Sequence, residues 1–284
     1  MKTKIENKIS RFLTTNLDIV NNKKVLLPFR YAGGKYYALK ALRKFWEIEH
    51  DEYREPMFGG GAIFWAKEKI KYNWINDIDK ELINTLEVIR NENERNQLLD
   101  FFKDEKEANQ TKYSFVKNMN PVDSLERAYK FYYLNRTSFS GKMANPSWGY
   151  RPKRSLPPHR WVERIEPCGE KLKNVKITSL DFQEVINIPP QGKKVLMYLD
   201  PPYFLENNKN HYKNGFTKKD HLRLCELLKK TKFNFFLSYN DCPEVRKIYN
   251  WANTNSLNFF YRQDNSRNNG NKRTMSNELV ITNF

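Results

Sequence analysis

Short apolar runs and amphipathic stretches follow one another along most of the chain. The stretch 36–46 has helical spacing, which places Leu39, Leu42 and Phe45 on one face. Runs typical of strands are EYREPM (52–57), YNWI (72–75), VKIT (175–178), VLMYL (195–199), FNFFLSY (233–239) and ELVIT (278–282). Because helical stretches separate most of these runs, the pattern predicts an α/β fold with a parallel sheet.

The alternation stops between about residues 95 and 174, where the chain reads as helical and loop-rich. Its clearest helix is DSLERAYKFYYLNR (123–136), in which Asp123 and Glu126 have capping-box spacing. The end of this region is basic and interrupted by prolines. We therefore predict four segments: an N-terminal arm (1–27), the first half of an α/β domain (28–95), an inserted subdomain (96–174) and the second half of the same domain (175–284).

The 284 residues carry a formal net charge of +17, with a pI near 9.6. This balance favours polyanions as partners, nucleic acid before anionic membranes, although biased codon usage is a plain alternative. No apolar run approaches the roughly 20 residues of a membrane span. The three cysteines are widely scattered, which argues against a disulfide framework or a zinc site. We expect a cytoplasmic protein without a metal or a membrane partner.

A glycine-rich turn and an acid mark the first half of the predicted sheet. FGGGA (58–62) lies between a strand and a helix, where glycine lets the backbone approach a ligand. Asp77 ends the next strand, 18 residues beyond Gly59, and acids near this offset commonly bind ribose hydroxyls. The turn lacks G-x-G-x-x-G and G-K-[ST], which argues against NAD and ATP. The alternative is a tight turn followed by a helix-capping acid.

The tetrapeptide DPPY (200–203) directly follows an apolar run. Asp200 should stand at the carboxyl edge of the sheet, where α/β enzymes bind ligands, and the two prolines end the strand. An exocyclic amine on a base is a poor nucleophile, because the ring delocalises its lone pair. The Asp200 carboxylate and the Pro201 carbonyl can accept its two N–H bonds and favour a pyramidal nitrogen, while Tyr203 stacks on the base. The simpler alternative is a strand-ending turn with an exposed acid.

Six motifs occur in one order across residues 28 to 283: RYAGGK (30–35), EPMFGGGA (55–62), NDID (76–79), NRTSFSG (135–141), DPPY (200–203) and NELVITN (277–283). In this order they resemble the Dam-type family of DNA adenine-N6 methyltransferases. The resemblance implies a Rossmann-like methyltransferase sheet with an inserted, mainly helical DNA-recognition subdomain. It also implies S-adenosylmethionine as cofactor, with residues 28–95 as the cofactor-binding half and residues 175–284 as the catalytic half of the domain.

The resemblance further implies two sets of site residues. The cofactor is expected to contact Tyr31 (Trp in many relatives), Lys35, Phe58, Gly59, Gly61, Asp77 and Asp200. The adenine and its amine are expected to contact Asp200, Pro201, Pro202 and Tyr203. For Lys35 alone, a solvated lysine at a helix start is the alternative.

The inserted subdomain is then the expected reader of double-stranded DNA. An aromatic residue after Asn135 and Arg136 can wedge into the base stack as the adenine is extruded. Relatives that read GATC have Tyr-Asn-Gly and then an arginine; here FSG (139–141) is followed by KMA, so GATC is not assigned. The candidate DNA contacts, to bases or phosphates, are Asn135, Arg136, Phe139, Ser140, Arg151, Lys153, Arg154, Arg267, Lys272 and Arg273.

We expect a monomeric enzyme that transfers methyl to N6 of a flipped-out adenine, alone or beside a cognate restriction endonuclease. Methylation of cytosine N4 is the nearest alternative, because cytosine presents a similar amine. A catalytically silent DNA-binding protein of the same fold is another, although the intact Lys35, Asp77 and DPPY favour an enzyme.

Overall fold

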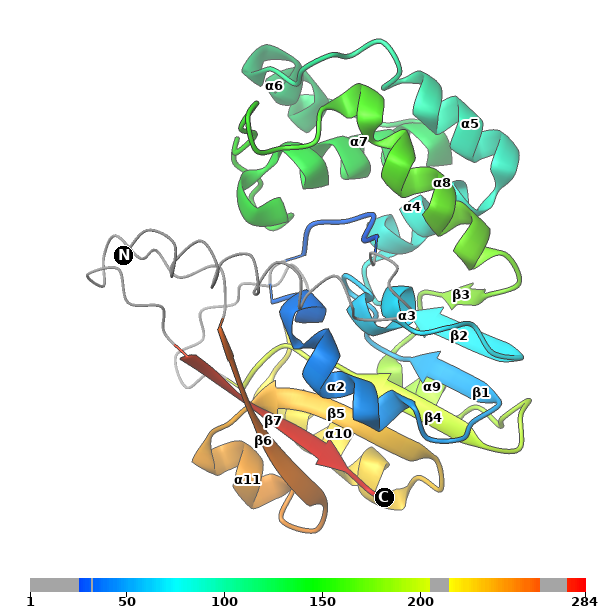
Figure 1. Ribbon diagram of the computed structural model, residues 1–284, viewed down its shortest axis with the longest axis vertical. Helices are drawn as coiled ribbons and strands as arrows, with labels where there is room; N and C mark the ends of the chain where they lie inside the picture. The colour runs from blue at the N-terminus through cyan, green and yellow to red at the C-terminus, as the bar shows by residue number, and fades with distance from the viewer. Residues whose placement is uncertain (1–25, 32, 205–214, 261–274) are drawn as a thin grey trace, which may run out of the picture.

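The computed structural model describes residues 26–31, 33–204, 215–260 and 275–284. These form a seven-stranded sheet of order β3-β2-β1-β4-β5-β7-β6 (Figure 1). The strands are β1 (Glu52–Glu55), β2 (Tyr72–Asn76), β3 (Lys176–Thr178), β4 (Val195–Leu199), β5 (Asn234–Asn240), β6 (Asn253–Phe260) and β7 (Met275–Thr282). The pairs among β1 to β5 are parallel, whereas β7 pairs antiparallel with β5 and β6. The predicted α/β fold is confirmed.

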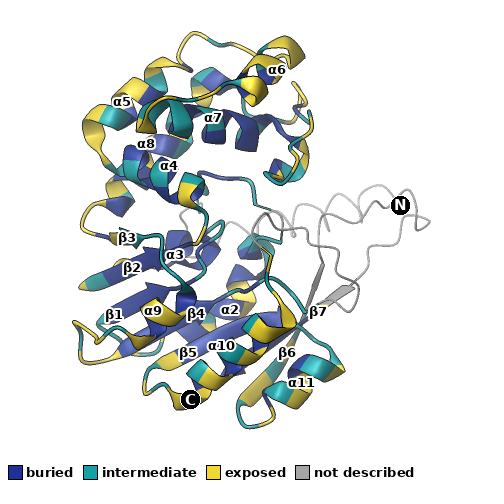
Figure 2. Ribbon diagram, turned by 180° about the vertical axis from the view of Figure 1, so that it is seen from behind, coloured by how far each residue is buried: buried dark blue, intermediate teal, exposed yellow. Residues whose placement is uncertain are grey.

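Helices cover both faces of the sheet. One face carries η1 (Lys35–Ala38), α2 (Leu39–Trp46) and α3 (Ala62–Ala66). The other carries α9 (Phe182–Asn187), α10 (Lys218–Lys230) and α11 (Pro243–Ile248), which lie on the near side in Figure 2. The strand β4 is buried along its whole length, and its side chains alternate between these faces: Leu196 and Tyr198 pack toward α2, Met197 and Leu199 toward α10.

A group of helices stands beyond the β3 edge of the sheet (Figure 1). It comprises α4 (Lys80–Arg90), α5 (Glu92–Asp100), α6 (Gln110–Asn118), α7 (Ser124–Thr137), η2 (Phe139–Gly141), η3 (Pro158–Arg160) and α8 (Val162–Leu172). The fully buried ring of Trp161 packs edge-on against Phe102 and Tyr132, with ring centroids 4.8 and 5.5 Å apart. These side chains belong to the same buried cluster as α2 and α3, so the helical group shares its core with the sheet.

Side-chain caps start α4 at Asp79 and α7 at Asp123, the second of them as the sequence predicts. Asp79 accepts the Glu81 amide at 3.0 Å, and Asp123 accepts the Glu126 amide at 2.8 Å. The Glu126 carboxylate bonds the Val122 amide instead of the cap's own amide, so the second half of that box is altered. On the α2 face, the predicted apolar residues Leu39, Leu42 and Phe45 are all buried. No helix in the part of the chain that the structure describes is long and apolar enough to cross a membrane.

Candidate active site

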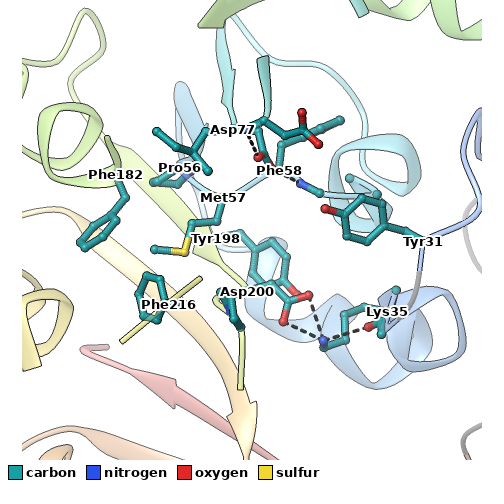
Figure 3. A pocket seen from close by; sticks show the side chains of 18 of the residues that line it. Tyr31, Lys35, Pro56, Met57, Phe58, Asp77, Phe182, Tyr198, Asp200 and Phe216 are labelled. Atoms are coloured by element: carbon teal, nitrogen blue, oxygen red, sulfur yellow. Dashed lines mark hydrogen bonds and ion pairs between the residues drawn. The ribbon is translucent and has the colours of Figure 1, made fainter. Parts of the chain in front are cut away.

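The parallel strands bring their carboxyl ends to one edge of the sheet, and a cavity lies there (Figure 3). Asp77 follows β2, Leu180 follows β3 and Asp200 follows β4; all three line the cavity. From the predicted cofactor set the cavity wall contains Tyr31, Lys35, Phe58, Gly59, Gly61, Asp77 and Asp200. The fold thus gathers every predicted cofactor residue around one space.

The glycine turn forms one wall of this cavity. Gly59 and Gly61 have positive φ angles of 49° and 63°, which side chains rarely adopt. A Cβ on Gly61 would stand 2.1 Å from the Phe58 ring, and one on Gly60 would stand 2.8 Å from Cβ of Tyr31. Glycine is therefore required for the turn to pack between these two aromatic side chains.

Asp77 ties this turn to β2. Its Oδ2 accepts the Gly59 amide at 2.7 Å, and its Oδ1 accepts the Asp79 amide at 2.9 Å. Burial raises the pKa of Asp77 to about 6, although these backbone hydrogen bonds oppose the rise. Because each carboxylate oxygen has two lone pairs, Asp77 can still accept hydrogen bonds from a ligand.

Asp200 lies in a network of buried polar groups. The Lys35 ammonium is 2.7 Å from Oδ1 and 2.8 Å from Oδ2, and the Ser238 hydroxyl donates to Oδ1 at 3.0 Å. The Asp200 side chain remains 23% exposed and lines the cavity. The carboxylate is therefore ion-paired, but it is open to a ligand rather than sealed away from it.

Of the other three DPPY residues, Pro202 alone is among the described residues that line this cavity, while Pro201 is buried. The Tyr203 ring centroid lies 5.0 Å from the Lys35 ammonium, and its hydroxyl donates to Glu278 on β7. Glu278 is not among the residues predicted from the sequence; it lies in the closing NELVITN motif (277–283), which carries the family resemblance without indicating a role for this residue.

The end of the cavity away from Lys35 contains residues that were not predicted from the sequence. Phe182 and Phe216 face each other there, with ring centroids 5.7 Å apart, and Met57 lies beside them (Figure 3). Arg223, which also lines the cavity, is paired with Asp181 at 2.9 Å, and its guanidinium lies over the Phe182 ring, 4.2 Å from the centroid. The position of Asp181 and Phe182 directly after the β3 region is the signal that could have indicated them.

A second cavity is lined by arginines from the helical group and from the segment before η1. Its wall contains Arg30, Arg136, Phe139, Ser140, Gly149, Arg151, Arg154, Ser155 and Leu156. No Asp or Glu is among the described residues on this wall. The Arg136 Nε atom is buried without a hydrogen-bond partner among the described residues, and burial lowers the pKa of Arg136. This cavity is electropositive and suits an anion.

The predicted DNA contacts differ in how they meet the surface. Phe139 is 47% exposed, and Ser140 beside it has a φ of 55°. Asn135 is fully buried, and its side chain bonds both the amide and the carbonyl of Arg30 at 2.8 Å. Lys153 is exposed outside the arginine wall. Arg267, Lys272 and Arg273 lie outside the described residues.

An open sheet of this order, with a glycine turn after β1, an acid after β2 and a carboxylate after β4, is a Rossmann-like fold with its ligand cavity at the carboxyl ends of the strands. Residues 31–262 match the family model of D12 class N6 adenine-specific DNA methyltransferases. The chain therefore belongs to the D12 class N6 adenine-specific DNA methyltransferase family, which confirms the predicted family, enzyme class and target atom.

Named relatives agree with this assignment. The Type II methyltransferase M1.LlaDCHI of Lactococcus lactis subsp. cremoris is 27% identical over 290 residues, covering 93% of this chain and 97% of the relative. The Type II methyltransferase M.CviBI of Paramecium bursaria Chlorella virus NC1A is 26% identical over 224 residues, covering 78% and 85%. The DNA adenine methylase of Haemophilus influenzae is 27% identical over 244 residues, covering 79% and 83%.

Proposed function

We propose that this enzyme takes its methyl group from S-adenosylmethionine and transfers it to an adenine flipped out of double-stranded DNA. One observation carries the proposal. The Asp200 carboxylate opens into the same cavity as the glycine turn and Asp77, so groups suited to a nucleoside and to an amine share one space. The methyl donor and the target can therefore meet at Asp200.

The lining residues fit S-adenosylmethionine. We assign its methionine part to the glycine turn beside Phe58, its ribose hydroxyls to Asp77 and its adenine ring to the aromatic pair Phe182 and Phe216. When bound, the cofactor would supply an electrophilic sulfonium methyl group, whose carbon–sulfur bond breaks as a neutral thioether leaves. Lys35 and Tyr31 complete the lining of this cavity.

The chain's own groups prepare the amine. The Asp200 carboxylate accepts one N–H bond and the Pro201 carbonyl accepts the other, which localises the nitrogen lone pair for attack on the methyl carbon. The Tyr203 ring holds the face of the base. The proton that the methylated nitrogen must lose passes to the Asp200 carboxylate, which already accepts that N–H bond.

The helical segment 96–174 supplies the DNA-reading surface. Arg30 lines the arginine cavity and Tyr31 the methyl-transfer cavity, so consecutive residues, with Cα atoms about 3.8 Å apart, join the two sites. We assign phosphate or guanine contacts to the arginine wall and the wedge that replaces the extruded base to Phe139. Asn135 acts indirectly, because its buried amide fixes the backbone of Arg30.

Two of the relatives named above are type II methyltransferases, which supports a role beside a restriction endonuclease with the same recognition site. Single-molecule sequencing of DNA from cells that express the enzyme gives the modified base and its sequence context. With that context known, a duplex with 2-aminopurine at the target position should gain fluorescence on binding, since extrusion unstacks the base. Unchanged fluorescence would contradict base flipping.

The reaction itself is tested by mass spectrometry of nucleosides from DNA incubated with enzyme and S-adenosylmethionine. We expect N6-methyladenine as the product and a calorimetric signal for S-adenosylmethionine binding that is lost in Asp77→Ala. N4-methylcytosine as the sole product, or no detectable cofactor binding by the wild type, would overturn the proposal.

A further inference from the structure

Glu278 is a buried carboxylate next to Asp200 that the proposed function does not use. Its side chain is 0% exposed, and its Oε1 accepts the hydrogen bond from the Tyr203 hydroxyl. Its Oε2 has no hydrogen-bond partner among the described residues. Because burying a carboxylate with unused acceptors costs free energy, its place beside the reacting group requires a physical reason.

Lys35 connects this carboxylate to the reacting one. The ammonium nitrogen lies 2.7 Å from Asp200 Oδ1 and 3.5 Å from Glu278 Oε1, and the Lys35 side chain is 2% exposed. A buried ammonium group needs a nearby anion, and here two carboxylates stand within 4 Å of it. Lys35 can therefore pair with either carboxylate without entering water.

In this arrangement the ion pair between Lys35 and Asp200 competes with the target amine for the Asp200 oxygens. Lys35 contacts both oxygens of Asp200, and the Ser238 hydroxyl donates to one of them. A carboxylate offers about four lone-pair positions, so three are already in use. The positive charge of Lys35 also weakens Asp200 as an acceptor for the amine.

We propose that Glu278 is a positioning residue that takes up Lys35 when the target amine donates to Asp200, and so releases that carboxylate from its ion pair. The inference rests on the proposed function, since it concerns the access of the amine to Asp200. Lys35 moves over a short distance, toward an anion that already attracts it.

The charge of Glu278 decides whether the exchange can occur. The charged and titratable groups that face it, among the described residues, are Lys35 from η1, Asp200 and Tyr203 from the segment after β4, and Tyr198 from β4. Burial raises the pKa of Glu278 to about 7; Asp200 adds to the rise, while Lys35 and the Tyr203 hydrogen bond oppose it. Below this pH the carboxyl group is neutral, so kcat should fall as the pH falls through about 7.

Two variants test this dependence. Glu278→Gln keeps the size and an acceptor oxygen for Tyr203 but loses the charge. We expect its kcat at high pH to fall about tenfold and its KM for DNA to change less than about twofold. The acid limb of the pH profile, which is the fall of kcat as the pH drops through about 7, should disappear. Tyr203→Phe keeps the ring but removes a hydrogen bond that lowers the pKa of Glu278, so its acid limb should move to higher pH.

The controls separate this inference from the function on which it rests. Calorimetric titration with S-adenosylmethionine shows whether Glu278→Gln keeps its fold and cofactor site. A wild-type kcat with an unchanged acid limb in this variant would overturn the inference and assign the limb to another group, such as Asp77 with its pKa near 6. If Glu278→Gln does not fold, an unmoved limb in Tyr203→Phe overturns it. A wild type that makes no N6-methyladenine would overturn the proposed function instead.

Discussion

Glu55, the last residue of β1, has a buried carboxyl group that accepts hydrogen bonds from the Tyr53 hydroxyl and, at 2.8 Å, from the Phe64 amide. Burial raises the pKa of Glu55 from 4.5 to about 8, although both hydrogen bonds oppose the rise. Between these two values the folded protein holds a proton that the unfolded chain has released. The contribution of Glu55 to the free energy of unfolding therefore falls as the pH rises through this window.

Glu55→Gln should make the melting temperature less dependent on pH between 4.5 and about 8, because the amide cannot titrate and still offers an acceptor oxygen. Thermal melts followed by circular dichroism at several pH values measure this. Glu226→Gln, a change at an exposed site on α10, serves as the control and should leave the dependence unaltered. Parallel curves for Glu55→Gln and the wild type would contradict the assignment.

At the scale of the element, the turn between β1 and α3 holds the cofactor wall through backbone shape. Gly61→Ala combines a φ of 63° with a Cβ only 2.1 Å from the Phe58 ring, so we expect a loss of about 1–3 kcal/mol in the free energy of unfolding and weaker S-adenosylmethionine binding. Chemical denaturation and calorimetry measure the two effects. Gly34→Ala is the matched control: its Cβ would meet its nearest atom at 3.1 Å without a positive φ, so its loss should be smaller. Equal losses of unfolding free energy in the two variants would contradict the requirement for glycine at position 61.

Sequence periodicity predicts the elements whose two faces differ or whose residues are all apolar. The fully buried β4 and the amphipathic α2 are examples, and both are confirmed. Periodicity does not predict β6, because NTNSL (253–257) is mostly polar; the pairing of this strand with β7 comes from tertiary structure.

In the site, too, sequence patterns predict single residues but not the contacts between distant ones. The DPPY motif indicates Asp200, but its bond to Lys35 joins residues 165 positions apart, and no local pattern encodes that contact.

At the scale of the whole molecule, the net charge of +17 and the acid-free arginine cavity predict DNA binding that weakens steeply with salt. If Arg151 contacts a phosphate, Arg151→Ala should reduce the slope of log K against log salt by about one. Lys193→Ala is the matched control, because this exposed lysine lies before β4, at the opposite edge of the sheet from the site. Filter binding over a series of salt concentrations measures both slopes. Equal reductions in the two variants would contradict a dedicated phosphate site.

The most direct test of the role of Asp200 is single-turnover methyl transfer by Asp200→Ala, with DNA affinity measured in parallel. We expect transfer to adenine to fall by a factor of about 100 to 1,000, because the amine loses the acceptor that localises its lone pair. DNA affinity should stay within about threefold of the wild type, since the arginine cavity lies outside the change. Transfer at a near wild-type rate in this variant would contradict the role of Asp200.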